Sequence, residues 1–456
     1  MLDTVKVVLR YEAYKDSKID GVGELPAHWG VKRFLNLFSF GKGLNITKEN
    51  LQDEGIPCVN YGEVHSKYGF EVDPEKHPLK HVSKDYLLTS QKSLLNPGDF
   101  VFADTSEDIE GSGNFTQLTG MGDVFAGYHT VIARPAKGHN HRYLAYLLDS
   151  TSYRDQVRKS VKGVKVYTIS QAVLKNTFLW LPKIEEQTSI ANYLDGKTAQ
   201  LDQAVAIKQQ QIALLKERKL ILIQHAVTRG LNPNAPLRDS GVEWIGEIPA
   251  KWKIESFKNI LIERNKKNDP IESRERLSLS IDKGITLYSE KTTNLDRFKD
   301  DFSQYKLTHK GDLVFNSMNM IVGAVGVSDY FGCISPVYYA YYTQLENPNI
   351  TKYYEYFFKS RIVQSQLYCL GKGIMAIDRG DGKFNTVRLK VSRDDLRSMK
   401  VPYPTISEIT EIVDFIELES SKIDKAIKLQ EQQIEKLKEY KATLINSAVT
   451  GKIKVA

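Results

Sequence analysis

Four loop-like stretches of the chain combine lysine or arginine with glycine, asparagine or tyrosine. A glycine between cations lets the backbone approach a phosphate, and lysine and arginine supply the opposite charge, so this combination is typical of contacts to nucleic acid. Reading base edges also needs hydrogen-bonding side chains on loops. We therefore predict DNA contacts at Lys42, Lys162, Lys165, Tyr167, Lys266, Lys267, Lys372, Arg379 and Lys383.

Any one basic loop of this kind is more often a solvated surface turn than a binding site. Two of the loops, at residues 161–167 and 370–383, nevertheless occupy matching places, because each precedes one of two long helical segments. Residues 372–400 hold eight Lys or Arg against four Asp. Because the position is repeated, DNA binding and a plain surface turn are equally favoured interpretations of this loop.

The sequence lacks the catalytic motifs of common enzyme classes. The sequence has no GxxxxGK[ST] loop, no GxSxG elbow, no HExxH helix, and no FxGxG or Asp/Asn-Pro-Pro-aromatic motif of amino-methyltransferases. Glu217-Arg218-Lys219 has the ExK spacing of some nucleases but no partner carboxylate motif, and the pair His139 and His141 lacks further metal ligands. We predict no catalytic residue, no metal site and no cofactor in this chain.

The composition is that of an ordinary globular protein, with 41% hydrophobic and 26% charged residues, which argues against disordered, collagen-like and membrane classes. The net charge of +7 is compatible with nucleic-acid binding without demonstrating it. Cys58, Cys333 and Cys369 form no CxxC pair, which is typical of reduced thiols. No secretory signal and no apolar run of roughly 18 residues is present. The expected location is the cytoplasm.

An internal duplication organises the chain. Residues 16–34 match residues 239–257, and residues 182–228 match residues 404–450, both at a spacing of about 222 residues. Between these matches one short anchor survives, Gly98-Asp99-Phe100-Val101-Phe102 against Gly311-Asp312-Leu313-Val314-Phe315. The flanking segments are repeated, whereas the segments between them differ in sequence. This pattern favours two sites of one type with two specificities.

The second repeated segment predicts one long helix in each copy. Both copies are rich in helix formers and carry apolar residues at heptad spacing, which indicates a coiled coil. They share the same interruptions, a polar d position (Lys208, Gln430) and a lysine at an a position (Lys219, Lys441). The alternative is that each stripe packs only on its own domain. The predicted interface is Leu194, Leu201, Val205, Ile212, Leu215, Leu222, Ile416, Ile423, Ile427, Ile434, Leu437 and Leu444.

The ends of these helices carry recognisable signals. Thr405 and Glu408 predict a capping box, and Gly230 and Gly451 stand where each helix should stop. The repeat leaves fewer than about ten residues between the first helix and the second domain. A parallel helix pair would need a connection of roughly 15 extended residues. We therefore expect an antiparallel pair.

The remaining segments predict domains of mixed α/β structure. We expect strands at residues 99–102, 131–133, 313–315 and 337–342, and helices at residues 143–161 and 352–370. The fold class is thus α+β, with two domains separated by two long helices in an antiparallel coiled coil, and an internal pseudo-two-fold repeat. The predicted boundaries are 1–181 for the first domain, 182–230 for a helical spacer, 231–403 for the second domain and 404–456 for a C-terminal helical spacer.

The whole chain resembles the specificity subunit of a type I restriction–modification enzyme. The resemblance rests on the two-copy layout and on helical segments that begin at Leu181-Pro182 and at Val401-Pro402-Tyr403-Pro404 and close with Ala-Val-Thr. It also rests on Asp16-Ser17…Gly23-Glu24-Leu25-Pro26-x-x-Trp29 and its repeat Asp239-Ser240…Gly246-Glu247-Ile248-Pro249-x-x-Trp252.

The resemblance implies that each domain is a target recognition domain that reads one half of a bipartite site in double-stranded DNA, and that the helices fix the spacer. It implies that two methyltransferase subunits dock around the coil, that restriction subunits join them, and that S-adenosylmethionine, ATP and magnesium belong to these partners. The chain itself would be inactive. Divergence of the two domains predicts an asymmetric site for DNA methylation and host defence.

Three alternatives stand beside this interpretation. A self-contained nuclease or methyltransferase is disfavoured by the missing motifs. An interaction scaffold would use the coiled coil and bind protein through its variable domains. A specificity subunit of an inactive or regulatory system would share every feature above.

Overall fold

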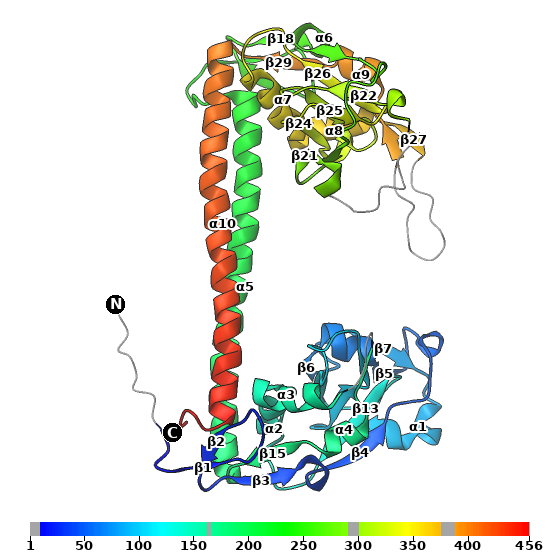
Figure 1. Cartoon of the computed structure of the whole chain (residues 1–456), viewed down its shortest axis with the longest axis vertical. Helices are drawn as coiled ribbons and strands as arrows, with labels where there is room; N and C mark the ends of the chain where they lie inside the picture. Colours follow the sequence, from blue (N-terminus) through cyan, green and yellow to red (C-terminus); the bar gives the residue numbers. More distant parts are fainter. Residues whose placement is uncertain (1–9, 162–165, 291–300, 375–387, 456) are drawn as a thin grey trace. The chain divides into compact units, whose positions relative to one another are not determined.

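The chain divides into two units, each of which combines one domain with parts of both long helices. The computed structural model describes residues 10–161, 166–290, 301–374 and 388–455. The first unit comprises Met1–Lys208 and Glu431–Ala456, and the second comprises Gln209–Gln430. In Figure 1 the first unit is therefore coloured blue to green and red, and the second green to orange. The expected α+β fold class with two long helices and an internal repeat is confirmed.

The first domain is built from short strands and four short α-helices. Its strands are β1 (Tyr14–Asp16), β2 (Glu24–Pro26), β3 (Gly30–Arg33), β4 (Phe38–Lys42), β5 (Ile56–Val59), β6 (Phe70–Val72), β7 (Lys80–Val82), β8 (Leu94–Leu95), β9 (Phe100–Ala103), β10 (Thr105–Ser106), β11 (Phe115–Leu118), β12 (Val124–Ala126), β13 (Thr130–Pro135), β14 (Tyr167–Thr168) and β15 (Phe178–Leu181). Its helices are α1 (Tyr86–Thr89), α2 (His141–Asp149), α3 (Thr151–Ser160), α4 (Gln171–Lys175) and the π-helix η3 (Glu63–Lys67).

A five-stranded sheet in the order β4-β13-β9-β11-β6 forms the centre of this domain. Alternate residues of β9 face opposite sides, as strand geometry requires. Phe100 and Phe102 join the core formed with α2 and α3, whereas Val101 and Ala103 face a second sheet in the order β7-β5-β12-β8. The central sheet thus lies between two helices and a smaller sheet.

The second domain repeats this plan with fewer central strands. Its strands are β16 (Leu237–Asp239), β17 (Glu247–Pro249), β18 (Lys253–Ser256), β19 (Ile262–Arg264), β20 (Leu277–Ser280), β21 (Gly284–Leu287), β22 (Lys306–Thr308), β23 (Leu313–Asn316), β24 (Val325–Val327), β25 (Gly332–Ile334), β26 (Tyr338–Tyr342), β27 (Lys372–Ile374), β28 (Arg388–Lys390) and β29 (Lys400–Tyr403). Its helices are α6 (Phe257–Ile260), α7 (Asn349–Lys359), α8 (Arg361–Leu370) and α9 (Arg393–Ser398).

The central sheet of the second domain has the order β19-β26-β23-β24, and its strands β23 and β26 occupy the places of β9 and β13. Leu313 and Phe315 face the core formed with α7 and α8, and Val314 faces β20 and β21. The pair β18-β29 likewise repeats the pair β3-β15.

Two expected helices are each broken into two. The helix expected at residues 143–161 is α2 followed by α3, and the helix expected at residues 352–370 is α7 followed by α8. The breaks fall at Ser150 and Ser360, whose ψ angles of 145° and 146° are extended. Ser150 caps α3 by accepting a hydrogen bond from the N–H of Tyr153. Serine favours the N-cap position, so a serine here ends one helix and starts the next.

The long helices α5 (Ile184–Arg229) and α10 (Ile406–Val449) end as predicted. The Thr405 and Glu408 capping box is confirmed, with the Glu408 N–H donating to Thr405 Oγ1 at 3.3 Å and the Thr405 N–H donating to Glu408 Oε2 at 3.2 Å. Gly230 and Gly451 have φ of 72° and 68°, the left-handed conformation of a helix stop. Throughout the described ranges, no helix is both long and apolar enough to cross a membrane.

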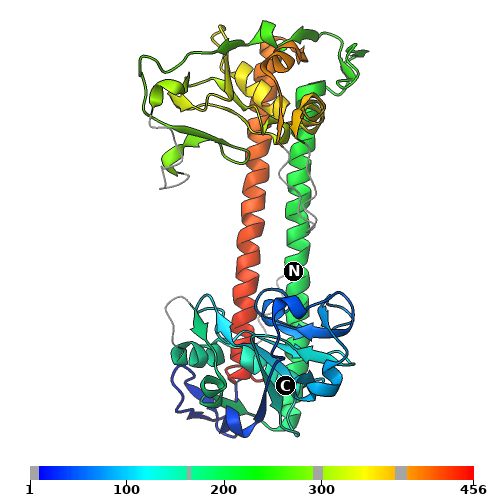
Figure 2. The ribbon, with the colours of Figure 1, turned by 90° about the vertical axis from the view of Figure 1, so that its right-hand side faces the viewer.

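Within each unit, parts of α5 and α10 lie side by side and run antiparallel (Figure 1 and Figure 2). In the first unit Asp202 contacts Lys441 and Lys208 contacts Gln433, so partners on α10 move backwards as α5 advances. All residues of the predicted heptad interface are buried or half-buried, whereas Lys436 and Leu214 between them are exposed.

Candidate nucleic-acid interface

The short anchor shared by the two copies starts the central strand of each domain. Gly98 and Gly311 have φ of 94° and 88°, which glycine adopts without strain. The aspartates that follow, Asp99 and Asp312, are buried and accept a hydrogen bond from the backbone N–H three residues earlier, at 2.9 and 2.8 Å. The anchor therefore makes a turn that aims β9 and β23 along equivalent paths.

Each of these aspartates is paired with an arginine from the same sheet. Arg134 Nε lies 3.0 Å from Asp99 Oδ2, and Arg264 Nε lies 2.6 Å from Asp312 Oδ2. Burial raises the pKa of Asp99, although its hydrogen bonds and Arg134 act in the opposite direction. Both arginines thus hold the turn that starts the central strand.

The end at which β9 finishes, which we call the loop end of the sheet, brings together predicted contacts of the first domain. Lys42 is the last residue of β4 and pairs with Val131, which in turn pairs with Phe102 near the end of β9. Tyr167 lies in β14, which pairs with β10 directly beyond β9. Lys42 and Tyr167, which are remote in sequence, therefore lie at one end of one sheet.

In both domains the chain that follows the predicted loop contacts the loop end in the same way. In the first, the Ile169 N–H donates a hydrogen bond of 2.7 Å to the carbonyl of Asp104. In the second, the Val391 N–H donates a hydrogen bond of 3.0 Å to the carbonyl of Ser317. The two donors correspond in the repeat, and both acceptors follow the central strand. The matching loop positions seen in the sequence thus have matching attachments.

The described basic candidates of the second domain lie at or near its loop end. Lys266 and Lys267 follow β19 after Asn265, and both are exposed. Lys266 Nζ lies 2.6 Å from Glu272 Oε1, and Lys372 Nζ lies 3.6 Å from Asp395 Oδ2. Four further candidates lie outside the described residues: Lys162, Lys165, Arg379 and Lys383.

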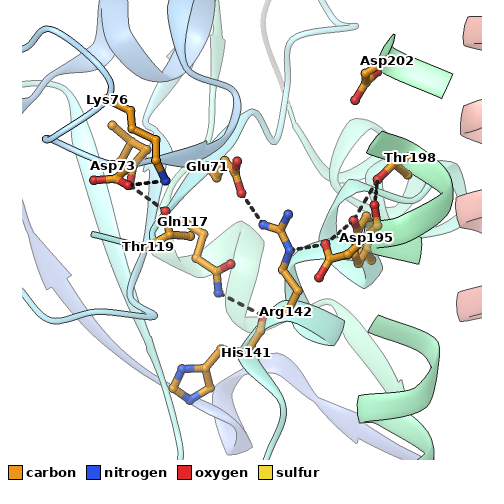
Figure 3. A network of polar contacts seen from close by, with 12 residues as sticks. Glu71, Asp73, Lys76, Gln117, Thr119, His141, Arg142, Asp195, Thr198 and Asp202 are labelled. Carbon is orange, nitrogen blue, oxygen red and sulfur yellow. Dashed lines mark hydrogen bonds and ion pairs between the residues drawn. The ribbon is translucent and has the colours of Figure 1, made fainter. Parts of the chain in front are cut away.

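Arg142 fastens the first domain to the beginning of α5 (Figure 3). Its Nη1 lies 2.6 Å from Glu71 Oε2 on β6, and its Nε lies 2.7 Å from Asp195 Oδ1 on α5. The guanidinium also lies over the ring of Phe70. The hydroxyl of Tyr146 donates to the same Asp195 oxygen at 2.6 Å. One arginine therefore links an edge strand, a domain helix and the long helix.

The second domain is fastened to its own long helix at the corresponding place. Glu417, which corresponds to Asp195, has its Oε1 2.6 Å from Lys352 Nζ on α7. The attachment is therefore repeated with different residue types. In both units an ion pair thus joins a helix of the domain to the long helix.

Comparison with known proteins agrees with this architecture. A family model described as the type I restriction modification DNA specificity domain matches residues 26–217. A protein of Methanocaldococcus jannaschii, provisionally named as the MjaX type I restriction enzyme specificity subunit, is 22% identical over 457 residues, covering 98% of this chain and 99% of that protein. The EcoKI type I specificity subunit of Escherichia coli K12 is 24% identical over 412 residues, with coverage of 87% and 82%.

Residues 26–217 thus resemble the type I DNA specificity domain, and the chain is similar to type I specificity subunits over most of its length. Solved structures share its fold. A chain from a study of complex assembly and conformational transition in a type I restriction–modification system has a TM-score of 0.65, with 14% identity and coverage of 93% and 98%. The HsdS subunit of Thermoanaerobacter tengcongensis has a TM-score of 0.51, with 14% identity and coverage of 94% and 98%.

The loop end of the first domain carries polar rings that the sequence did not single out. His65 lies in the π-helix η3, with its Nε2 3.4 Å from Ser106 Oγ and its ring stacked on Tyr61. His129 Nδ1 lies 3.3 Å from Asp104 Oδ1. A π-helix has no sequence period of its own, and Ser106 and Asp104, the polar partners of the two histidines, are remote from them in sequence.

The loop end of the second domain carries cations that were also missed. Lys306 begins β22, and Arg393 begins α9. Lys306 Nζ and the Arg393 guanidinium lie 5.7 and 5.9 Å from the centre of the Tyr339 ring. A basic loop signal could not reveal them, because Lys306 reads as one residue of a strand and Arg393 as the start of a helix.

Residues that suggested other chemistry have structural partners. Lys219 of the ExK triplet pairs with Asp424 on α10. His139 lies 3.4 Å from the side-chain amide of Gln187, and burial lowers the pKa of both His139 and His141. In the part of the chain that the structure describes, no three His, Cys, Asp or Glu side chains are grouped as a metal site requires.

Proposed function

We propose that this chain is the DNA-reading, non-catalytic subunit of a type I restriction–modification enzyme, in which each domain recognises one half of a bipartite and asymmetric site in double-stranded DNA. The proposal rests on the loop ends of the two domains. They have a corresponding arrangement of strands and helices, but they carry different side chains. Gln171 in the first domain, for example, corresponds to Arg393 in the second. Two different half-sites require such an exchange, because base pairs differ in their donors and acceptors.

We further propose that the long helices fix the spacing between the two half-sites. Two modest readers on a stiff connection gain affinity from each other only when both half-sites have the right separation. The repeated ion pairs Arg142 with Asp195 and Lys352 with Glu417 support this proposal, because each ties a domain to a helix.

The proposed partners are two methyltransferase subunits, which dock around the helices, and restriction subunits, which complete the nuclease. S-adenosylmethionine, ATP and magnesium would be bound by these partners. The repeat supports two equivalent docking places, and it thereby supports modification of one base on each strand of the site.

The test combines DNA binding with methylome sequencing. We expect the full chain to retard DNA sequence-selectively when its methyltransferase subunit is present, and the complex to methylate a bipartite site with two unlike halves. Methylation by the chain alone with S-adenosylmethionine, or cleavage by it with magnesium, would show a self-contained enzyme. A complex without sequence selectivity would favour a scaffold, and two identical half-sites would contradict asymmetric reading.

A further inference from the structure

Lys306 is a nearly buried cation at the loop end of the second domain. Its exposed fraction is 9%, and its Nζ donates a hydrogen bond of 3.1 Å to the carbonyl of Tyr338. Among the described residues, no carboxylate lies within 4 Å of this ammonium group. Burying a charge without a counter-charge is costly. Burial accordingly lowers the pKa of Lys306.

The neighbours of Lys306 increase the positive charge. Arg393 and Lys390 both depress the pKa of Lys306 further, so they lie close enough to repel it. Arg393 Nε lies 3.0 Å from Glu263 Oε1, and Arg397 Nη1 lies 3.6 Å from the other oxygen of the same carboxylate. Glu263 therefore faces several cations gathered beside Tyr339.

A backbone contact joins this group to one of the predicted DNA contacts. Lys267 and Lys306 form an isolated antiparallel β-bridge. The neighbouring residue, Lys266, accepts a hydrogen bond of 2.9 Å from the N–H of Leu307 through its carbonyl. Lys267 and Lys390 are exposed. The cations Lys267, Lys306, Lys390 and Arg393, which we call the loop-end cluster, thus extend from the interior to the surface.

The shared frame does not require these charges. The first domain has Ser93 where the second has Lys306, and Phe40 where the second has Glu263. Ser93 donates a hydrogen bond of 2.9 Å to the carbonyl of Lys42, and Lys175 Nζ lies 5.0 Å from the centre of the Phe40 ring. At these positions the first domain therefore has the same fold with Ser93, Phe40 and one cation, Lys175.

We infer that the loop-end cluster is a binding site for backbone phosphates of duplex DNA, and that it gives the second domain a larger share of the electrostatic attraction than the equivalent positions give the first. This inference rests on the proposed function. A phosphate oxygen would supply the counter-charge that Lys306 lacks. Phosphates are present in every sequence, so the cluster adds affinity and orientation without selecting bases.

The experiment measures the salt dependence of binding to a short duplex of arbitrary sequence, using the full chain assembled with its methyltransferase subunit. Lys306→Met and Arg393→Gln should each lower the slope of log K against log salt by about 0.9 per lost phosphate contact. Arg393→Lys keeps the charge and should retain the wild-type slope. Lys251→Gln is the matched control, because it removes an exposed charge beside Trp252, whose indole contacts the start of α10.

Wild-type slopes for both Lys306→Met and Arg393→Gln in folded complexes would overturn the inference, as would an equal loss for Lys251→Gln. If Lys306→Met does not fold, the comparison of Arg393→Gln with Arg393→Lys decides. Failure of the proposed function has a different signature, because the wild-type complex would then show no sequence-selective binding whatever the slopes.

Discussion

The ammonium group of Lys441 lies 2.6 Å from Asp202 Oδ2, and the repeat reproduces this pair as Lys219 and Asp424, 2.7 Å apart. Both lysines stand at a positions of the heptads, where an apolar residue would pack better. A polar residue at such a position trades stability for a defined register. In each unit the aspartate is in reach when α5 and α10 run antiparallel, so the two pairs specify the direction and alignment of the helices.

Reversing the charge of Lys441 should destabilise the first unit modestly. Exposed pairs contribute about 0.2–1 kcal/mol, so we expect Lys441→Glu to lower the free energy of unfolding by about 1 kcal/mol. Adding Asp202→Lys should recover most of this loss. A double-mutant cycle in urea measures the coupling, with Lys436→Glu on the exposed face of α10 as control. Additive effects of the two substitutions would refute the pairing.

A second prediction concerns the last turn of α5. The buried hydroxyl of Tyr353 donates a hydrogen bond of 2.8 Å to the carbonyl of Val227. In the first unit, Trp180 Nε1 does the same for Val449, which corresponds to Val227, at 2.5 Å. Tyr353→Phe leaves a buried carbonyl without this donor and should cost about 1–3 kcal/mol. Thermal unfolding measures the loss, and Tyr368→Phe at an exposed ring should change nothing.

The Arg142 attachment gives a third prediction. The planar guanidinium fork of Arg142 binds Glu71 and Asp195 while it lies over the Phe70 ring. The ammonium group of a lysine cannot make these contacts together. Arg142→Lys should therefore lower the free energy of unfolding by about 1 kcal/mol, a value reduced by the partial exposure of both carboxylates. Arg229→Lys, at the exposed end of α5, is the control. Equal melting temperatures for Arg142→Lys and wild type would show that the fork geometry is unimportant.

The sequence predicted what local patterns encode. The heptads, the Thr405 capping box and the stops at Gly230 and Gly451 depend on residues within a few turns of one another, and they were found where expected. The extended break at Ser150 was missed, because the apolar spacing continues from α2 into α3 and conceals the cap.

The missed parts of the candidate site are set by tertiary contacts. Lys306 and Arg393 lie far apart in sequence and share the Tyr339 ring only because β22, β26 and α9 meet at one end of a sheet. Likewise, the heptads identified Lys219 and Lys441 as interruptions but could not name their partners, because each partner lies on the other helix. The charge of a loop can be read from neighbouring residues in the sequence, whereas a cluster of charges depends on which segments the fold brings together.

The final prediction follows from the depressed pKa of Lys306. Burial, Arg393 and Lys390 lower this pKa below its usual value of 10.5, with Glu263 acting in the opposite direction. Between the lowered folded pKa and the unfolded value, the unfolded chain binds more protons, so stability rises with pH in this window and falls as the pH decreases. Lys306→Met removes the titrating group and should be at least as stable as wild type at neutral pH.

As the pH is raised towards 10.5, the wild type should gain stability relative to Lys306→Met. The difference in melting temperature between the two proteins, measured at neutral pH and in steps above it, checks the sign, because other titrating groups affect both proteins alike. A difference that stays constant with pH would mean that the amine is not penalised by burial. A variant that is stable and yet binds duplex DNA with a lower salt slope would show that the charge is retained for binding at a cost to folding.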